Sequence, residues 1–172
     1  LSRRKGHEDF IDVIAGLRQA GIPAHGLIVG GTHPDKRRYE VELRERIREQ
    51  SLGAAITLLG HRSDLSEIMA VSDVVLSLSR EPEAFGRVSL EALSLGRPVL
   101  AYDHGGVGEQ LAEIFPEGRV PVGDQAQVVE RLRAWYRTPP VVPARQPFTL
   151  ERMLTATLEV YQDAVAARDS RS

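Results

Sequence analysis

Helical and strand-like patterns of apolar residues alternate along the chain. Apolar residues at helical spacing predict helices over residues 7–20, 39–50, 65–71, 87–95, 107–114, 124–136 and 150–167. Short apolar runs predict strands over residues 24–29, 55–59, 73–78, 98–101 and 118–122. Strands and helices in this order are typical of a parallel sheet. The sequence therefore predicts an α/β fold: a Rossmann-like doubly wound parallel sheet with helices on both faces.

The same pattern predicts one domain over residues 1–172, with no internal repeat or low-complexity segment. An α/β core of residues 1–137 precedes a Pro-rich segment, 138–149, which we expect to cross the domain in extended form, and the C-terminal helix. The run 73–78 is apolar enough to be buried on both faces. Because the chain begins with Leu1 in the middle of the pattern, we expect a first strand and an N-terminal domain before it.

Composition narrows the classes of function. With a net charge of −2 and basic residues spread through the predicted helices, nucleic-acid binding has little support. The lack of Cys excludes disulfides and thiol chemistry and fits a reducing, cytoplasmic setting. No apolar run is long enough to span a bilayer. The histidines show no metal-ligand spacing, so we expect no metal ion.

Two carboxylates surround the start of the helix predicted over residues 87–95. Glu83 follows a strand on a loop broken by Pro82 and Gly86, and Glu91 lies in the opening turns of the helix. Ligands of open α/β sheets bind at such strand ends, and the free N–H groups of a helix start bind anions. The pair therefore fits a ligand with both phosphate and hydroxyl groups, such as a sugar nucleotide. Taken alone, each acid is better explained as an exposed surface residue, and the placement of both near a strand end is what favours a site.

Lys5 and several glycines extend this candidate site. Lys5 precedes the first helix and should lie at the same sheet edge, where its ammonium group could pair with phosphate; a solvated lysine is the alternative. Gly86 would let the backbone turn and present N–H groups to an anion, unless it is an ordinary loop glycine. Gly105 and Gly106 predict a further close backbone approach or a plain turn. Motifs of serine hydrolases, dinucleotide oxidoreductases and P-loop enzymes are absent from the sequence.

One run of residues resembles a known signature. The run E-A-F-G-R-V-S-L-E-A, followed by L-S-L-G-R-P-V-L-A, resembles the E-x(7)-E motif of the GT-B fold glycosyltransferases (glycosyl transferases group 1), which include sucrose synthase and bacterial mannosyltransferases. Nearly all of the chain is similar to landmarks of this family: RRKGHEDFIDVIAGL, LIVGG, LLGHRSDLSEIMAVSDVVLSLS, AYDHGGVGE, EGRVPVGD and FTLERMLTATLEVYQDAV. The resemblance implies the donor-binding C-terminal domain of a retaining transferase. The donor would be a UDP-, GDP- or ADP-sugar, with no cofactor and no metal ion.

The resemblance also implies roles for single residues. Lys5 would stabilise the charge on the departing diphosphate, and Glu83 would accept hydrogen bonds from donor-sugar hydroxyls, which makes these two the catalytic candidates. Glu91 would accept hydrogen bonds from the ribose. The remaining donor contacts would come from Phe85, Gly86, Arg87 and Val88 and, near the base, from Gly60, His61 and Arg62.

The sequence departs from the family pattern at several points. The phosphate-binding arginine would fall before Leu1, and Leu78 and Ala84 stand where the family often has prolines. The N-terminal domain, toward which the last helix would cross and which would bind acceptor and any membrane surface at the inner face, is not in this sequence. We therefore expect the chain alone to bind donor without transferring sugar. A GT-B sugar-nucleotide epimerase and a non-catalytic nucleotide-binding domain remain as alternatives.

Overall fold

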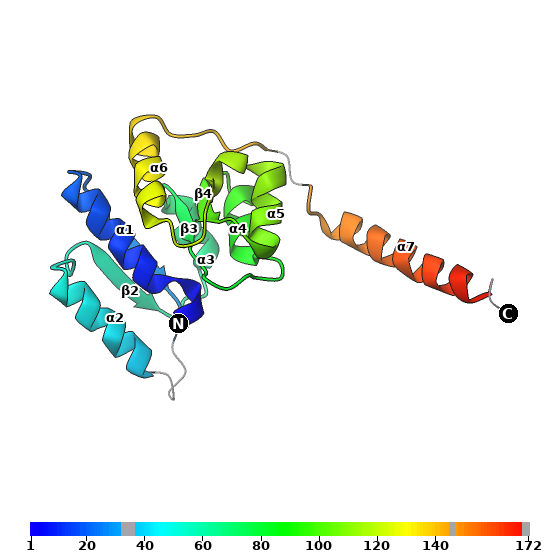
Figure 1. Cartoon of the computed structure of the whole chain (residues 1–172), viewed down its shortest axis with the longest axis horizontal. Coiled ribbons are helices and arrows are strands. Elements are labelled where there is room, and N and C mark those ends of the chain that lie inside the picture. The colour runs from blue at the N-terminus through cyan, green and yellow to red at the C-terminus, as the bar shows by residue number, and fades with distance from the viewer. Residues whose placement is uncertain (32–36, 145–146, 170–172) are drawn as a thin grey trace.

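The computed structural model describes residues 1–31, 37–144 and 147–169. All predicted helices and strands are present, with their ends displaced by at most two residues. Figure 1 shows an α/β core with a single helix projecting from it. In chain order the elements are η1 (Arg3–Lys5), α1 (His7–Gln19), β1 (Gly26–Val29), α2 (Arg37–Glu49), β2 (Ile56–Gly60), α3 (Leu65–Val71), β3 (Val75–Ser77), α4 (Arg87–Ser94), β4 (Val99–Tyr102), α5 (Gly105–Ile114), η3 (Pro116–Gly118), β5 (Arg119–Val120), α6 (Gln125–Arg137) and α7 (Leu150–Asp169).

The strands form two parallel sheets flanked by helices. β1 pairs with β2, and β4 lies between β3 and β5. Helix α1 packs on β1, α2 and α6, while α4 packs on β3 and β4 and α5 on β4 and β5. The parallel pairing confirms the predicted α/β class. Within the described residues no ladder joins the two sheets, so the strands are not hydrogen-bonded into one continuous sheet.

The start of the chain lies between the carboxyl ends of the two sheets. The amino group of Leu1 donates a hydrogen bond to the carbonyl of Gly31, just after β1. The carbonyl of Arg4 accepts hydrogen bonds from the backbone N–H of Arg80 (2.8 Å) and the hydroxyl of Ser79 (3.1 Å), just after β3. The first residues of the chain therefore contact both sheets at their carboxyl ends.

Burial differs sharply between neighbouring strands. All four residues of β4 are buried, as expected for a central strand of apolar residues. The prediction that the run 73–78 is buried on both faces is wrong for β3, whose residues are only half-buried. The reason is its position, because among the described residues β3 pairs with β4 on one side only and forms a sheet edge. The two residues that follow the strand closely, Leu78 and Ser79, are buried.

Helix α7 projects away from the core in Figure 1. The described parts of the preceding Pro-rich segment contain no helix or strand, and residues 145–146 and 170–172 lie outside the described residues. The apolar side chains of α7 are 52–68% exposed: Leu150, Met153, Leu154, Leu158, Val160, Tyr161 and Val165. This stripe has helical spacing, as predicted, but the core does not cover it. No helix among the described residues combines the length and apolar character that a membrane span requires.

Gly6 lets the start of α1 contact the end of β3. Its φ of 70° lies in the left-handed region, and a Cβ at this position would overlap the carbonyl oxygen of Leu78. Both constraints favour glycine, since a side chain would have to tolerate an unfavourable backbone conformation and push the strand end away. The close contact places the residue before it, Lys5, beside the loop that follows β3.

We expect Gly6→Ala to lower the free energy of unfolding by about 2 kcal/mol or more, through backbone strain and displacement of Leu78. Urea denaturation of wild type and variant measures this difference. The control is Gly53→Ala, because a Cβ there meets no atom within 4 Å. Equal losses for the two variants would contradict the close packing of Gly6.

Candidate functional site

An ion pair lies at the carboxyl end of β3. Lys5 ends η1 and Glu83 lies on the loop between β3 and α4, yet Lys5 Nζ is 2.8 Å from Glu83 Oε1. The structure thus brings together the two residues for which the resemblance implies catalytic roles. Their side chains are 44% and 26% exposed, respectively, so the pair is reachable from solvent.

A small cavity opens around this pair. Its volume is about 250 Å³, and its lining residues are Arg4, Lys5, Ser79, Glu81, Pro82, Glu83 and Ala84. Two cations and two carboxylates thus line one hollow. Pockets that enclose a whole small ligand measure roughly 300–1,000 Å³, so this cavity suits one part of a larger ligand. The side chain of Arg4 makes no hydrogen bond or ion pair with the residues that the structure describes, but it lines the same cavity and its charge acts on Glu83.

The environment keeps Glu83 ionised. Burial alone would raise the pKa of Glu83, but the hydrogen bonds from Lys5 and Ser79 and the charges of Lys5 and Arg4 outweigh it and hold this pKa below its usual value. A carboxylate accepts hydrogen bonds and cannot donate them. At neutral pH Glu83 is therefore suited to accept hydrogen bonds from ligand hydroxyls and is a poor general acid.

The N-terminus of α4 adds backbone donors next to this loop. Gly86, with a φ of 79°, is its N-cap residue, and a Cβ there would overlap Val107. No side-chain hydrogen bond caps this helix, so its first N–H groups are available to an anion. Arg87 and Val88 are exposed at this end, as donor contact would require.

Two glycines of α5 hold the loop that carries Glu83. The N–H of Gly106 donates a hydrogen bond of 2.8 Å to the carbonyl of Glu83. A Cβ on Gly105 would come within 2.7 Å of that carbonyl oxygen, and one on Gly106 would strike the backbone of Ala84 and Phe85. The close approach predicted at these glycines is therefore present, and it is made by the loop itself. Gln110 also donates a hydrogen bond to the carbonyl of Phe85.

The remaining predicted donor residues do not line the cavity. Glu91 is exposed in the second turn of α4, and the half-exposed Phe85 ring packs edge-on against Phe148 with centroids 6.2 Å apart. Gly60, His61 and Arg62 follow β2, where the Arg62 Nε donates to Asp64 Oδ1 at 2.8 Å. Their proposed roles toward ribose, sugar and base remain predictions.

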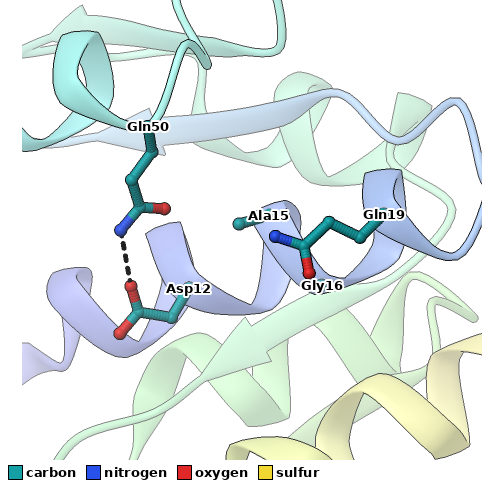
Figure 2. A pocket seen from close by; sticks show the side chains of 5 residues that line it. All are labelled: Asp12, Ala15, Gly16, Gln19 and Gln50. Carbon is teal, nitrogen blue, oxygen red and sulfur yellow. Dashed lines mark hydrogen bonds between the residues drawn. The ribbon is translucent and has the colours of Figure 1, made fainter.

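A second cavity lies along the side of α1 (Figure 2). It is larger, about 370 Å³, and is lined by Asp12, Ala15, Gly16, Gln19 and Gln50. Its one carboxylate, Asp12, already accepts hydrogen bonds from Arg46 and Gln50. The described residues that line it include neither a cation nor a helix N-terminus for phosphate, so we assign the candidate site to the smaller cavity at the strand ends.

Several residues of the site were not predicted from the sequence. Arg4 and Glu81 line the cavity, and His104 Nε2 donates a hydrogen bond of 2.8 Å to the carbonyl of Ser79. The position of Arg4 next to Lys5 was a usable signal, whereas nothing in local spacing marks His104. Among the described residues no group of His, Cys, Asp or Glu is placed to hold a metal ion. Metal independence stays a prediction.

Comparison with known proteins identifies the family. The model of the family described as "Glycosyl transferases group 1" matches residues 1–147, and the chain belongs to this family. It is 31% identical to a D-inositol 3-phosphate glycosyltransferase from Jonesia denitrificans, covering 92% of this chain and 40% of that protein. It is also 32% identical to the lipopolysaccharide core mannosyltransferase LpsB of Rhizobium meliloti, over 63% of this chain and 31% of that protein.

Two solved structures share the fold of this chain. HepE of Anabaena, solved in complex with UDP and glucose, superimposes with a TM-score of 0.73 at 28% identity, over 80% of this chain and 37% of that one. Sucrose-phosphate synthase of Thermosynechococcus elongatus gives a TM-score of 0.77 at 25% identity, over 96% and 44%. These findings confirm the family and fold predicted by the resemblance. The chain spans less than half the length of each of these proteins.

We expect Lys5→Met to raise the pKa of Glu83, because the hydrogen bond and the charge of Lys5 are removed while burial, Ser79 and Arg4 remain. Carboxyl carbon shifts of Glu83, followed by NMR against pH, measure this pKa. The control Arg3→Met removes a cation that pairs with Glu8 and Glu42 instead. A Glu83 pKa that responds equally to both substitutions, or to neither, would contradict the specific pairing.

The same pair makes stability depend on pH. Because the folded-state pKa of Glu83 is lowered, its contribution to stability is fully present above the ordinary pKa of an unfolded glutamate and is lost as the pH falls through the folded-state pKa. We expect this acid-side loss of unfolding free energy to be smaller in Lys5→Met. Urea denaturation at a series of pH values from neutral to acidic measures it, and an unchanged pH dependence would contradict this linkage.

Proposed function

We propose that this chain is the donor-binding domain of a metal-independent, retaining glycosyltransferase, which transfers a sugar from a nucleoside-diphosphate sugar to an acceptor hydroxyl. The Lys5–Glu83 ion pair, 2.8 Å long and set in a cavity at the strand ends, carries the proposal. Cations and helix N–H groups are the usual partners of phosphate, and an ionised carboxylate is a usual partner of sugar hydroxyls. The cavity and the adjoining helix start offer all of these.

The chemistry that follows is mainly electrostatic. A donor diphosphate would compete with Glu83 for the Lys5 ammonium, and Arg4 offers a second cation at the same cavity. As the bond to the sugar breaks, negative charge grows on the leaving diphosphate, and preorganised cations and N–H groups stabilise it. Glu83, released from Lys5, would accept hydrogen bonds from the sugar. In this proposal Glu91 accepts hydrogen bonds from the ribose hydroxyls, and it lies on the helix whose first N–H groups face the phosphate.

The relatives support a nucleotide-sugar donor. HepE has been solved with UDP alone, with UDP-glucose, and with UDP and glucose, and its identity to this chain in these structures is 28–30%. UDP is accordingly the first nucleotide to test, followed by GDP and ADP. For the longer protein, we propose retention of configuration, acceptor binding by an N-terminal domain, a cytoplasmic setting and peripheral membrane contact. The chain alone is expected to bind donor without transfer.

We expect at least one of UDP, GDP and ADP to bind the chain in calorimetric titration, and Lys5→Ala to weaken that binding about 10- to 100-fold, since a charge-assisted hydrogen bond contributes roughly 1.5–3 kcal/mol. Arg3→Ala is the matched control, because Arg3 lies in the same short helix but pairs with Glu8 and Glu42. Absence of binding at millimolar concentration, or equal losses for both variants, would overturn the assignment.

Substitutions of Glu83 and Glu91 should weaken the binding of different ligands. Glu91→Ala should weaken binding of the nucleoside diphosphate, whereas Glu83→Gln should weaken mainly the intact sugar nucleotide, because Glu83 is proposed to contact the sugar. Equal effects of both changes on binding of the diphosphate alone would contradict these separate roles.

Incubating the longer protein with labelled donor distinguishes a transferase from an epimerase and from a non-catalytic binding domain. A glycosylated acceptor plus free nucleoside diphosphate supports transfer, an epimerised sugar nucleotide supports an epimerase, and no turnover supports a binding domain.

A further inference from the structure

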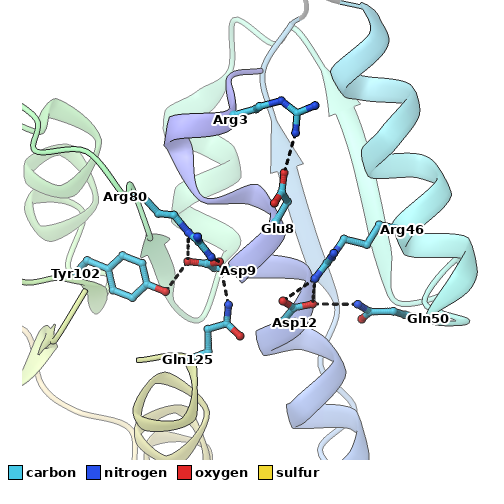
Figure 3. Close-up of polar contacts among 9 residues, drawn as sticks. All are labelled: Arg3, Glu8, Asp9, Asp12, Arg46, Gln50, Arg80, Tyr102 and Gln125. Carbon is cyan, nitrogen blue, oxygen red and sulfur yellow. Dashed lines mark hydrogen bonds and ion pairs between the residues drawn. The ribbon is translucent and has the colours of Figure 1, made fainter. Parts of the chain in front are cut away.

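One fully buried carboxylate joins four parts of the molecule (Figure 3). Asp9 lies in the first turn of α1 with 0% of its side chain exposed. Its Oδ2 accepts hydrogen bonds from Arg80 Nε (3.0 Å) and the Tyr102 hydroxyl (2.7 Å). Its Oδ1 accepts from Gln125 Nε2 (2.9 Å) and from the second nitrogen of the Arg80 fork. The partners come from the loop after β3, from β4 and from the start of α6.

Asp9 is held in its ionised form. Burial alone would raise its pKa, but the hydrogen bonds from Arg80 and Tyr102 outweigh burial and keep the pKa below its usual value. Arg80 is different, because its side chain is 57% exposed. Contact with Asp9, more than burial, therefore fixes the direction of this arginine and of the loop that carries it.

Arg80 connects Asp9 to both halves of the candidate site. It lies on the same loop as Glu83, close to it in sequence. Its backbone N–H donates to the carbonyl of Arg4, the residue before Lys5, at 2.8 Å. The side chain of Arg80 thus ties the loop to α1, and its backbone ties the loop to the segment that carries Lys5. Movement of Arg80 would shift Glu83 relative to Lys5.

We propose that Asp9 is a positioning residue for the Lys5–Glu83 pair, acting through the two-pronged contact with Arg80 and without touching the donor. The expected effect on nucleotide binding rests on the proposed function, whereas the effect on the ion pair does not. Removing the Asp9 charge would loosen the loop after β3, weaken the ion pair and misplace the groups that meet the diphosphate and the sugar.

The chain contains a matched control on the same helix. Asp12 accepts two hydrogen bonds of 2.8 Å from Arg46 and one of 2.9 Å from Gln50, but these contacts tie α1 to the end of α2. Figure 3 shows the two carboxylates on α1 with their separate sets of partners. Asp12→Asn therefore removes one partly buried carboxylate charge from α1 and leaves the contacts of the Glu83 loop unchanged.

The deciding measurement is the pKa of Glu83 in Asp9→Asn and Asp12→Asn, followed by carboxyl NMR. Loss of a nearby negative charge by itself would lower the pKa of Glu83, because the charged form would then meet less repulsion. Loss of positioning would raise it, because Lys5 would no longer pair closely. We expect Asp9→Asn to raise it and Asp12→Asn to leave it unchanged or lower it. A lowered or unchanged pKa in Asp9→Asn overturns the proposal.

A milder variant serves if Asp9→Asn does not fold. Arg80→Lys keeps the positive charge but cannot form the two-pronged contact, so it should also raise the pKa of Glu83; no change would overturn the proposal. Nucleotide titration gives the second readout, with binding weakened about tenfold in Asp9→Asn and unchanged in Asp12→Asn. If wild type binds no nucleotide, the proposed function fails while the pKa of Glu83 still decides the positioning role.

Discussion

The start of α1 lies backbone to backbone against the end of β3, and the candidate site depends on this contact. Gly6 lies directly on the carbonyl of Leu78, and the carbonyl of Arg4 accepts hydrogen bonds from Ser79 and Arg80. Two segments held this closely have little freedom to move apart. The side chains of Lys5 and Glu83, just beyond these contacts, therefore meet at a hydrogen-bonding distance although they are far apart in sequence.

Further polar contacts fix the loop between β3 and α4. Asp9 holds Arg80 through its side chain, His104 holds the carbonyl of Ser79, and Gly106 holds the carbonyl of Glu83. A loop without secondary structure of its own is thereby fixed from α1 and α5. Such preorganisation suits a site whose chemistry is electrostatic, because the donors and cations need not be rearranged as charge develops.

Periodicity predicted the elements, the parallel strands and the loop position of Glu83, because these follow from local patterns and from the rule that parallel strands end at one edge. The pairing of Asp9 with Arg80, 71 positions apart, was not predictable in this way. A signal existed, since Asp9 shares a helix face with the buried Val13 and Leu17, where a charged residue needs a partner. The half-burial of β3 and the direction of α7 depend on neighbours that no local pattern describes.

In the proposed function, donor phosphate and sugar bind at the Lys5–Glu83 cavity and the start of α4. Backbone amide NMR shifts recorded during a UDP titration, repeated with GDP and ADP, show where the ligand binds. We expect the largest shifts at Lys5, Glu83, Gly86 and Arg87, with Asp12 and Gln50 of the larger cavity unaffected. Shifts concentrated at Asp12 and Gln50, with none at the strand ends, would contradict it.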